Sequence, residues 1–171
     1  MIILGFDPGL ATLGYGVVKS ERGKNEMIDY GVVLTPKEEN LPVRLAMLEE
    51  GIKKVIQTFK PDEIAVEELF FCKNVTTAIN VAHARGVLLL TAVKECGRMY
   101  EYTPLQIKQA LTGYGRADKN QIQQMVKTFL RLSKIPKPDD AADAIAIALC
   151  HARSATSLIY QQEKFDPCST T

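Results

Sequence analysis

Short apolar runs alternate with polar turns over the first third of the chain. The runs cover Met1–Phe6, Leu13–Lys19 and Met27–Leu34, and the polar stretch 20–25 separates the second from the third. Runs of this length that are separated by Gly and Asn turns are typical of β-strands paired with their neighbours in sequence. The pattern therefore predicts an antiparallel meander of three strands.

A helical period replaces this pattern further along the chain. Apolar residues recur there at steps of three and four, at Leu41, Leu45, Leu48, Ile52, Val55 and Phe59. Such a stripe lies on one face of a helix, here predicted over 41–59, and Pro61 ends it. The short apolar run Ile64–Val66, which has an acidic residue on each side, is typical of a buried parallel strand.

Helices and strands alternate over the remaining part of the chain. We expect a long helix and a strand, then two short helices and a final helix, over Val75–Glu95, Arg98–Tyr102, Pro104–Leu111, Lys119–Leu130 and Asp139–Ala155. A meander followed by this alternation predicts an α/β fold, in which helices flank a mixed five-stranded sheet. We expect residues 1–157 to form a single domain and the polar residues 158–171 to be a flexible tail.

Length and composition agree with one globular domain. The chain has 171 residues, of which 46% are hydrophobic and 24% are charged, as in ordinary globular domains. No apolar run is long enough to cross a bilayer, and no signal-type segment begins the chain. The four cysteines form no CxxC pair and are predicted to be reduced thiols. The sequence thus predicts a cytoplasmic protein without a membrane partner.

Basic residues are concentrated in one segment, although the net charge of the chain is only +1. From Pro104 to Lys137, seven Lys or Arg residues stand against a single acid, Asp118. A basic segment suits the binding of a polyanion such as nucleic acid. A solvated helix face has the same composition, so charge alone leaves both interpretations open.

Four acidic residues fall where the predicted elements would bring them together. Asp7 ends the first strand, and Glu67 follows the buried strand. Asp140 and Asp143 are three residues apart in the alanine-rich last helix, so they share one face of it. Ligands of such sheets gather at the carboxyl ends of the strands, and the alanines would let this helix lie close to the sheet. We therefore expect all four carboxylates at one edge.

Carboxylates repel one another, so a cluster of four favours a site for hard divalent cations such as Mg²⁺. Two ions held close together can drive hydrolysis of a phosphodiester. Each acid also has a local explanation. Asp7 could belong to a turn with Pro8 and Gly9, Glu67 could be a solvated strand end, and Asp139 and Asp140 could cap the last helix. The combination favours a metal site over these separate explanations.

The motifs around these acids resemble those of the RuvC-type Holliday-junction resolvases, which are RNase H-like nucleases. They occur in the family's order from Ile2 to about Ala155, as Asp7-Pro8-Gly9, Ala65-Val66-Glu67 followed by Phe70, Lys73-Asn74, Ala84-Arg85-Gly86 and Asp140-Ala141-Ala142-Asp143-Ala144. The resemblance implies an RNase H-like fold. It also implies that Asp7, Glu67, Asp140 and Asp143 are catalytic ligands of two Mg²⁺ ions, which Mn²⁺ could replace.

The same resemblance implies a function and partners. The protein would be a homodimeric endodeoxyribonuclease that resolves four-way DNA junctions by paired symmetric cuts in recombination and repair, and a branch-migration motor would be a further partner. Phe70 matches the family's junction-facing aromatic residue, and Lys108 and Lys119 match its basic residues near the cut. We expect Lys73 and Arg116 to be further DNA contacts.

Three other functions are compatible with parts of this pattern. Actin-like phosphotransferases also begin with a strand that ends in Asp-x-Gly, but they need two such lobes, and this chain has no second copy. An RNase H-like nuclease could instead cut other branched DNA or RNA–DNA hybrids, since one fold serves several substrates. A non-catalytic junction-binding module would not need an intact set of acids.

Overall fold

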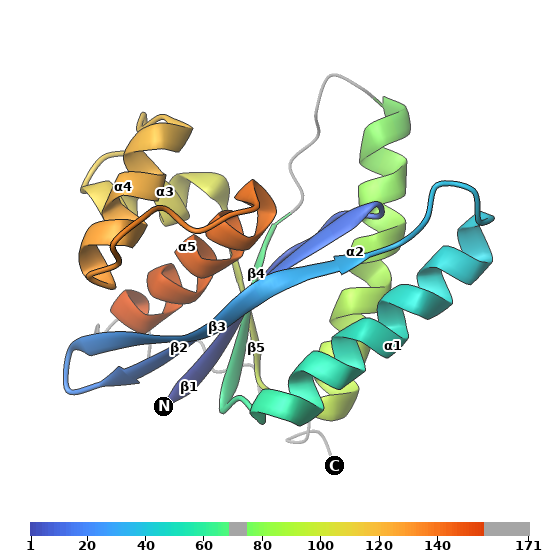
Figure 1. The fold of residues 1–171 in the computed structure, drawn as a ribbon, viewed down its shortest axis with the longest axis horizontal. Coiled ribbons are helices and arrows are strands. Elements are labelled where there is room, and N and C mark those ends of the chain that lie inside the picture. Colours follow the sequence, from blue (N-terminus) through green and yellow to red (C-terminus); the bar gives the residue numbers. More distant parts are fainter. Residues whose placement is uncertain (69–74, 156–171) are drawn as a thin grey trace, which may run out of the picture.

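Strand β1 lies at the centre of a five-stranded mixed sheet and fixes the layout of the fold (Figure 1). The computed structural model describes residues 1–68 and 75–155, without the side chains of residues 75–77. The strand order is β3-β2-β1-β4-β5, where the strands cover Ile2–Asp7 (β1), Thr12–Glu21 (β2), Lys24–Leu34 (β3), Glu63–Glu67 (β4) and Met99–Tyr102 (β5). The first three are antiparallel, whereas β4 runs parallel to β1 and β5 parallel to β4. The predicted meander and parallel strand are confirmed.

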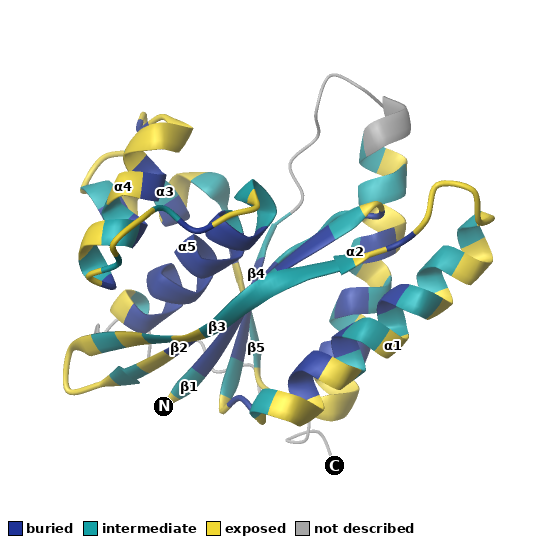
Figure 2. Cartoon of the chain, in the orientation of Figure 1, coloured by how far each residue is buried: buried dark blue, intermediate teal, exposed yellow. Residues whose placement is uncertain are grey.

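Helices cover both faces of the sheet (Figure 1). One face carries α1 (Leu41–Phe59) and α2 (Val75–Glu95), and the other carries α3 (Pro104–Thr112), α4 (Lys119–Phe129) and α5 (Asp139–Ser154). Helix α5 lies directly on the sheet and is buried along most of its length (Figure 2). None of the described helices has a stretch long and apolar enough to cross a membrane.

Alternation along the strands builds a separate core on each face. In β1, Ile3 is fully buried among residues of α3, α4 and α5, whereas Leu4 and Phe6 are buried against α1 and α2. Successive side chains of a strand point to opposite faces, so one central strand contributes to both cores. Burial on both faces explains why the β1 and β4 sequences are nearly continuous apolar runs.

Glycines in β1 and β2 allow α5 to approach the sheet very closely. Gly5 and Gly16 are paired across these two strands. A Cβ atom placed on Gly5 would lie 2.1 Å from the carbonyl oxygen of Ala144, and one on Gly16 would lie 2.8 Å from the backbone nitrogen of Ile145. Real Cβ atoms do not approach so closely, so only glycine fits at these positions. The position of α5 over the central strands is thereby fixed.

The turn between β2 and β3 is shorter than the predicted polar turn over 20–25. The strands continue to Glu21 and from Lys24, which leaves only Arg22 and Gly23 as the turn. Both turn residues have positive φ, +50° and +76°, as in a two-residue type I′ hairpin turn. Strand residues near this tip are polar and mostly exposed, so hydrophobic patterning did not reveal them as strand.

Candidate active site

Parallel pairing places Asp7 and Glu67 side by side at one edge of the sheet. Phe6 of β1 lies opposite Val66 of β4 in the parallel register, and Asp7 and Glu67 are the next residues of these strands. Neighbouring strands are about 4.8 Å apart, so the two carboxylates start from adjacent backbone positions. The predicted convergence at the carboxyl ends of β1 and β4 is present.

The first turn of α5 packs against this same edge. Gly14 of β2 lies opposite Asp7, and a Cβ atom placed on Gly14 would lie 2.1 Å from the backbone oxygen of Asp140. The N-cap of α5 is Pro138, and no side chain forms a cap hydrogen bond there. The interpretation of Asp139 and Asp140 as capping residues was therefore wrong. Both lie in the first turn, where the helix dipole stabilises negative charge.

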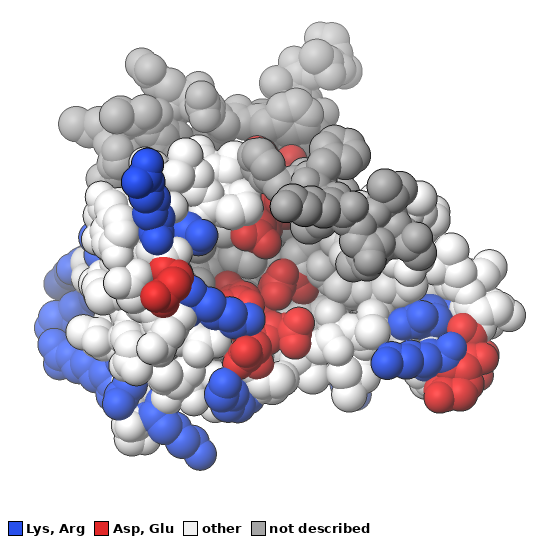
Figure 3. Space-filling view, turned by 90° about the horizontal axis from the view of Figure 1, so that it is seen from above, with Lys and Arg blue, Asp and Glu red and all other residues white. Residues whose placement is uncertain are grey.

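An open pocket joins three of the four acids to two lysines. Its volume is about 240 Å³, and its lining includes Asp7, Glu67, Asp143, Lys108 and Lys119. Figure 3 shows acidic side chains gathered in a hollow of the surface with basic side chains beside them. The pocket is thus a negatively charged centre with cations on the side of α3 and α4.

Burial and, after it, repulsion within this cluster raise the pKa values of three acids. Burial, followed by the charges of Glu67, Asp143 and Asp140, raises the pKa of Asp7 from its usual 3.8 to about 7, although Lys119 acts in the opposite direction. Burial and the charge of Asp143 also raise the pKa of Glu67. Burial raises the pKa of Asp143 as well, against the attraction of Lys119. The site therefore carries more negative charge than its own lysines neutralise.

The donor set suits a hard divalent cation. All donors are carboxylate oxygens, the ligands that Mg²⁺ and similar ions prefer, and the unneutralised charge around Asp7 would attract such an ion. Within the described residues, no three Asp, Glu, His or Cys side chains are already arranged around one ion position. The carboxylates therefore fit a metal by chemistry and charge.

The predicted basic residues differ in their relation to the pocket. Lys119 is the first residue of α4, and its Nζ lies 2.9 Å from Oδ2 of Asp143 and 3.5 Å from Oδ2 of Asp139. Lys108 lines the pocket and opposes the upward pKa shift of Glu67. Arg116 is exposed in the connection between α3 and α4, beside rather than within the pocket lining. The predicted contacts Phe70 and Lys73 lie outside the described residues.

A buried polar cluster that we did not predict connects α5 to the strands. His151 of α5 is fully buried, and its Nε2 lies 2.6 Å from Oε2 of Glu63 at the start of β4. Its Nδ1 lies 2.7 Å from the hydroxyl of Tyr102 in β5. The contact with His151 also holds the pKa of Glu63 below its usual value. This cluster ties together the two elements that carry Asp143 and Glu67.

A second unpredicted contact holds the other end of β4. Arg85 of α2 donates from Nε to the backbone oxygen of Glu67 at 3.4 Å, and its guanidinium pairs with the carboxylate of Glu101 in β5. Arg85 belongs to the Ala84-Arg85-Gly86 motif, so its identity was visible in the sequence. Its role was not, because the contact joins residues 18 positions apart across two elements.

This sheet order, with carboxylates at the ends of its two central parallel strands and on the helix packed over them, defines an RNase H-like nuclease. Residues 3–151 match the family model of the crossover junction endodeoxyribonuclease RuvC. The chain belongs to this family, and the resemblance noted in the sequence is confirmed. It is therefore an endodeoxyribonuclease of a metal-dependent family.

Individual relatives agree with this assignment over nearly the whole chain. The crossover junction endodeoxyribonuclease RuvC of Petrotoga mobilis is 57% identical over 151 residues, which are 88% of this chain and 93% of that protein. The corresponding protein of Alkaliphilus oremlandii is 54% identical over 154 residues, covering 90% of this chain and 94% of that one. The solved structure of Thermus thermophilus RuvC in complex with Holliday junction substrate has a TM-score of 0.85 at 38% identity, covering 91% of this chain and 94% of that one.

Proposed function

We propose that this chain resolves four-way DNA junctions in recombination and repair by hydrolysing one phosphodiester bond in each of two strands. The observation that carries the proposal is the acidic pocket at the ends of β1 and β4 and the start of α5, where burial and, after it, the neighbouring negative charges raise the pKa of Asp7 to about 7. A cation-binding carboxylate cluster beside exposed lysines suits a reaction at a DNA phosphate.

Asp7, Glu67, Asp140 and Asp143 would hold two Mg²⁺ ions, or Mn²⁺ in their place. Such ions supply activation of the attacking water and stabilisation of the leaving oxygen. The chain itself positions the carboxylates on rigid strands and a buried helix, which keeps their geometry fixed. Lys119 neutralises part of the charge of Asp143, at 2.9 Å, and lies in the same pocket, so it can also donate to a phosphate oxygen.

The DNA would lie over the face that α3 and α4 share with the acidic pocket. Lys108 on α3 and Lys119 on α4 both line the pocket, and Arg116 lies between these helices. Basic side chains at this place hold the phosphate backbone in position without reading sequence. Phe70 and Lys73 follow Glu67 in the sequence, and we propose that Phe70 stacks on a base at the crossover while Lys73 contacts phosphate.

A homodimer would place two such pockets at a fixed separation, as two symmetric cuts require. Helix α2 offers a surface for it. Ala84, Leu88 and Ala92 are buried against the sheet. The side of α2 that faces away from the sheet is apolar and exposed, with Ile79 51%, Leu90 56% and Val93 44% accessible. The small residues Ala82 and Gly86 are exposed too, and they leave room for the backbone of a second copy to approach this helix closely.

Cleavage of defined substrates tests the reaction. Wild-type protein with Mg²⁺ should make paired symmetric nicks in a four-way junction and leave duplex DNA and an RNA–DNA hybrid intact. Replacing Asp7, Glu67, Asp140 or Asp143 by its amide should abolish cutting and leave junction binding intact or tighter, because repulsion of the phosphate falls. Glu38→Gln, at an exposed loop position, is the matched control and should cut normally. Preferential cutting of the hybrid would instead favour the alternative nuclease function.

Sedimentation and mixing test the dimer. Sedimentation should give about twice the chain mass of 19.0 kDa. Leu90→Glu should yield monomers, whereas Leu34→Glu, which is equally exposed on β3, should not. Mixing wild type with excess Asp7→Asn protein should produce singly nicked junctions, because each heterodimer holds one active pocket. Paired cuts by a strictly monomeric protein would contradict the dimer. A branch-migration motor remains a proposed partner.

A further inference from the structure

Five exposed basic side chains converge far from the active site, around the turn between β2 and β3. We call this group the hairpin patch. It shares one open pocket of about 760 Å³ with only two acids, Glu21 and Glu26, and its members are Lys19, Arg22, Lys24, Arg131 and Arg153. Lys19 pairs with Glu21 at 3.6 Å in an exposed position, where such pairs are weak. The patch therefore carries a clear excess of positive charge.

The patch lies at the opposite end of the elements that form the active site. Lys19 lies opposite Ile2, at the start of β1, whereas Asp7 is at its end. Arg153 is near the end of α5, and Asp143 is near its start. Five residues of strand and ten residues of helix each correspond to roughly 15–17 Å. Helix α4 follows the same direction, from Lys119 at the pocket towards the patch.

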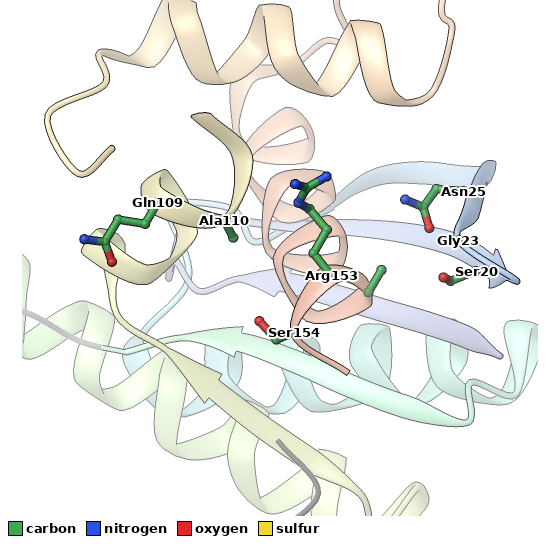
Figure 4. Close-up of a pocket in the computed structure, with 8 residues that line it drawn as sticks. Ser20, Gly23, Asn25, Gln109, Ala110, Arg153 and Ser154 are labelled. Atoms are coloured by element: carbon green, nitrogen blue, oxygen red, sulfur yellow. The ribbon is translucent and has the colours of Figure 1, made fainter. Parts of the chain in front are cut away.

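One arginine of the patch is held in place by an aromatic ring. The guanidinium carbon of Arg153 lies 4.7 Å from the centre of the Phe129 ring at the end of α4. Figure 4 shows Arg153 standing between Gln109 of α3 and Asn25 of β3, at the edge of an adjoining polar pocket. The planar fork of a guanidinium suits phosphate oxygens.

Two further arginines occupy backbone conformations that disfavour them. Arg22 has φ +50° and Arg131 has φ +51°, and the other described non-glycine residue with positive φ is Lys60. Left-handed backbone is unfavourable for a long side chain, and a two-residue hairpin turn prefers Asn before Gly at the position of Arg22. Strained residues that persist tend to have functional roles. Both arginines thus place their charge at this pocket in spite of an unfavourable backbone conformation.

We propose that the hairpin patch binds the phosphate backbone of a junction arm, beyond the crossover that the active site holds. This inference rests on the proposed junction-resolving function. The separation of roughly 15–17 Å along β1 and α5 corresponds to about five base pairs of duplex, at about 3.4 Å each. Three of the five cations are arginines, the residue best suited to phosphate. The patch would therefore anchor an arm and orient the crossover over the acidic pocket.

Neutralising the patch without harming the fold tests this site. The Arg22→Asn/Arg131→Asn double variant removes two charges and introduces a residue that tolerates left-handed backbone, so its melting temperature should equal or exceed that of wild type. Lys60→Asn makes the same change at the end of α1, on the other face of the sheet, and is the matched control. Junction binding in EDTA is measured over a range of salt concentrations.

The double variant should bind the junction more weakly, and its slope of log affinity against log salt should be shallower by about 2 for each bound subunit, or about 1 for each lost phosphate contact. A second junction carries neutral methylphosphonates about four to six base pairs from the crossover in every arm. Wild type should bind this junction more weakly than the unmodified one, and the double variant, which keeps only three of the five cations, should lose less affinity between the two junctions than wild type does. Lys60→Asn should behave like wild type throughout.

Other results would overturn the proposal. They are an unchanged salt slope, equal weakening by Lys60→Asn, or a double variant that distinguishes the two junctions as strongly as wild type does. Unchanged DNA binding with lost binding to a polyglutamate peptide would assign the patch to an acidic protein instead. Cleavage by wild type in Mg²⁺ is measured in parallel. A wild type that binds as expected but does not cut would reject the proposed function and leave the patch supported.

Discussion

The contact between α5 and β2 predicts that a single methyl group at Gly14 disables the active site. A Cβ atom there would lie 2.1 Å from the backbone oxygen of Asp140, where at least 3.0 Å is needed. The first turn of α5 must therefore move by about 1 Å. A displacement of about 1 Å at a catalytic group can reduce the rate about 100-fold, and overpacking of this kind costs about 1–3 kcal/mol of stability. Gly14→Ala should show both effects.

Single-turnover cleavage of a saturating junction and thermal unfolding measure these effects separately. Gly31→Ala is the control, because its added Cβ would meet the ring end of Tyr15, 2.7 Å from the hydroxyl, and a side chain can turn aside where a helix backbone cannot. We expect this variant to lose little stability and to cut normally. Cleavage by Gly14→Ala at the wild-type rate, or an equal loss in both variants, would refute the reasoning.

Three more predictions concern charged groups. In metal-free protein, Asp7 should lower the free energy of unfolding by at most about 4 kcal/mol as pH rises from about 4 to about 7, because burial and neighbouring acids raise the pKa of folded Asp7 from 3.8 to about 7. Urea unfolding in EDTA measures this pH dependence, and Asp7→Asn should flatten it. Lys119→Ala should slow cutting more than it weakens junction binding, whereas Arg116→Ala should mainly reduce affinity and its salt dependence. If both variants weakened binding only, these different roles for the two residues would be contradicted. His151→Phe should destabilise by about 3 kcal/mol in urea unfolding, because it leaves the half-buried Glu63 without its histidine, and adding Glu63→Leu should restore most of that loss.

The sequence predicted the elements well because each has a clear period. The apolar stripe defined α1 at its observed bounds, Leu41–Phe59, and alternation with glycine turns revealed the meander. Because β1 and β4 pair in parallel, Asp7 and Glu67 at their carboxyl ends lie next to each other. Local patterns determine such features, so one sequence is enough to predict them.

Contacts between distant residues could not be predicted in this way. Glu63 and His151 are 88 positions apart, and nothing near His151 in the sequence indicates a carboxylate partner. The ion pair of Lys119 with Asp143 likewise depends on how α4 packs against α5. The strand residues on each side of Arg22 and Gly23 were assigned to the turn for another reason, since a polar strand end has no hydrophobic pattern to mark it. Tertiary packing, rather than local preference, determines each of these contacts.

The mutual repulsion that adds to burial in raising the pKa of Asp7 would separate the carboxylates if the fold did not oppose it. Contacts at both ends of α5 oppose this separation of the carboxylates. At its N-terminus, the helix dipole stabilises Asp140, Lys119 offsets part of the charge of Asp143, and close backbone packing over Gly14 fixes the turn. At its other end, buried His151 binds Glu63 and prevents the helix from sliding along the sheet. Because α5 is held in this way, a bound cation would relieve the remaining repulsion, and metal binding and folding of the site should stabilise each other.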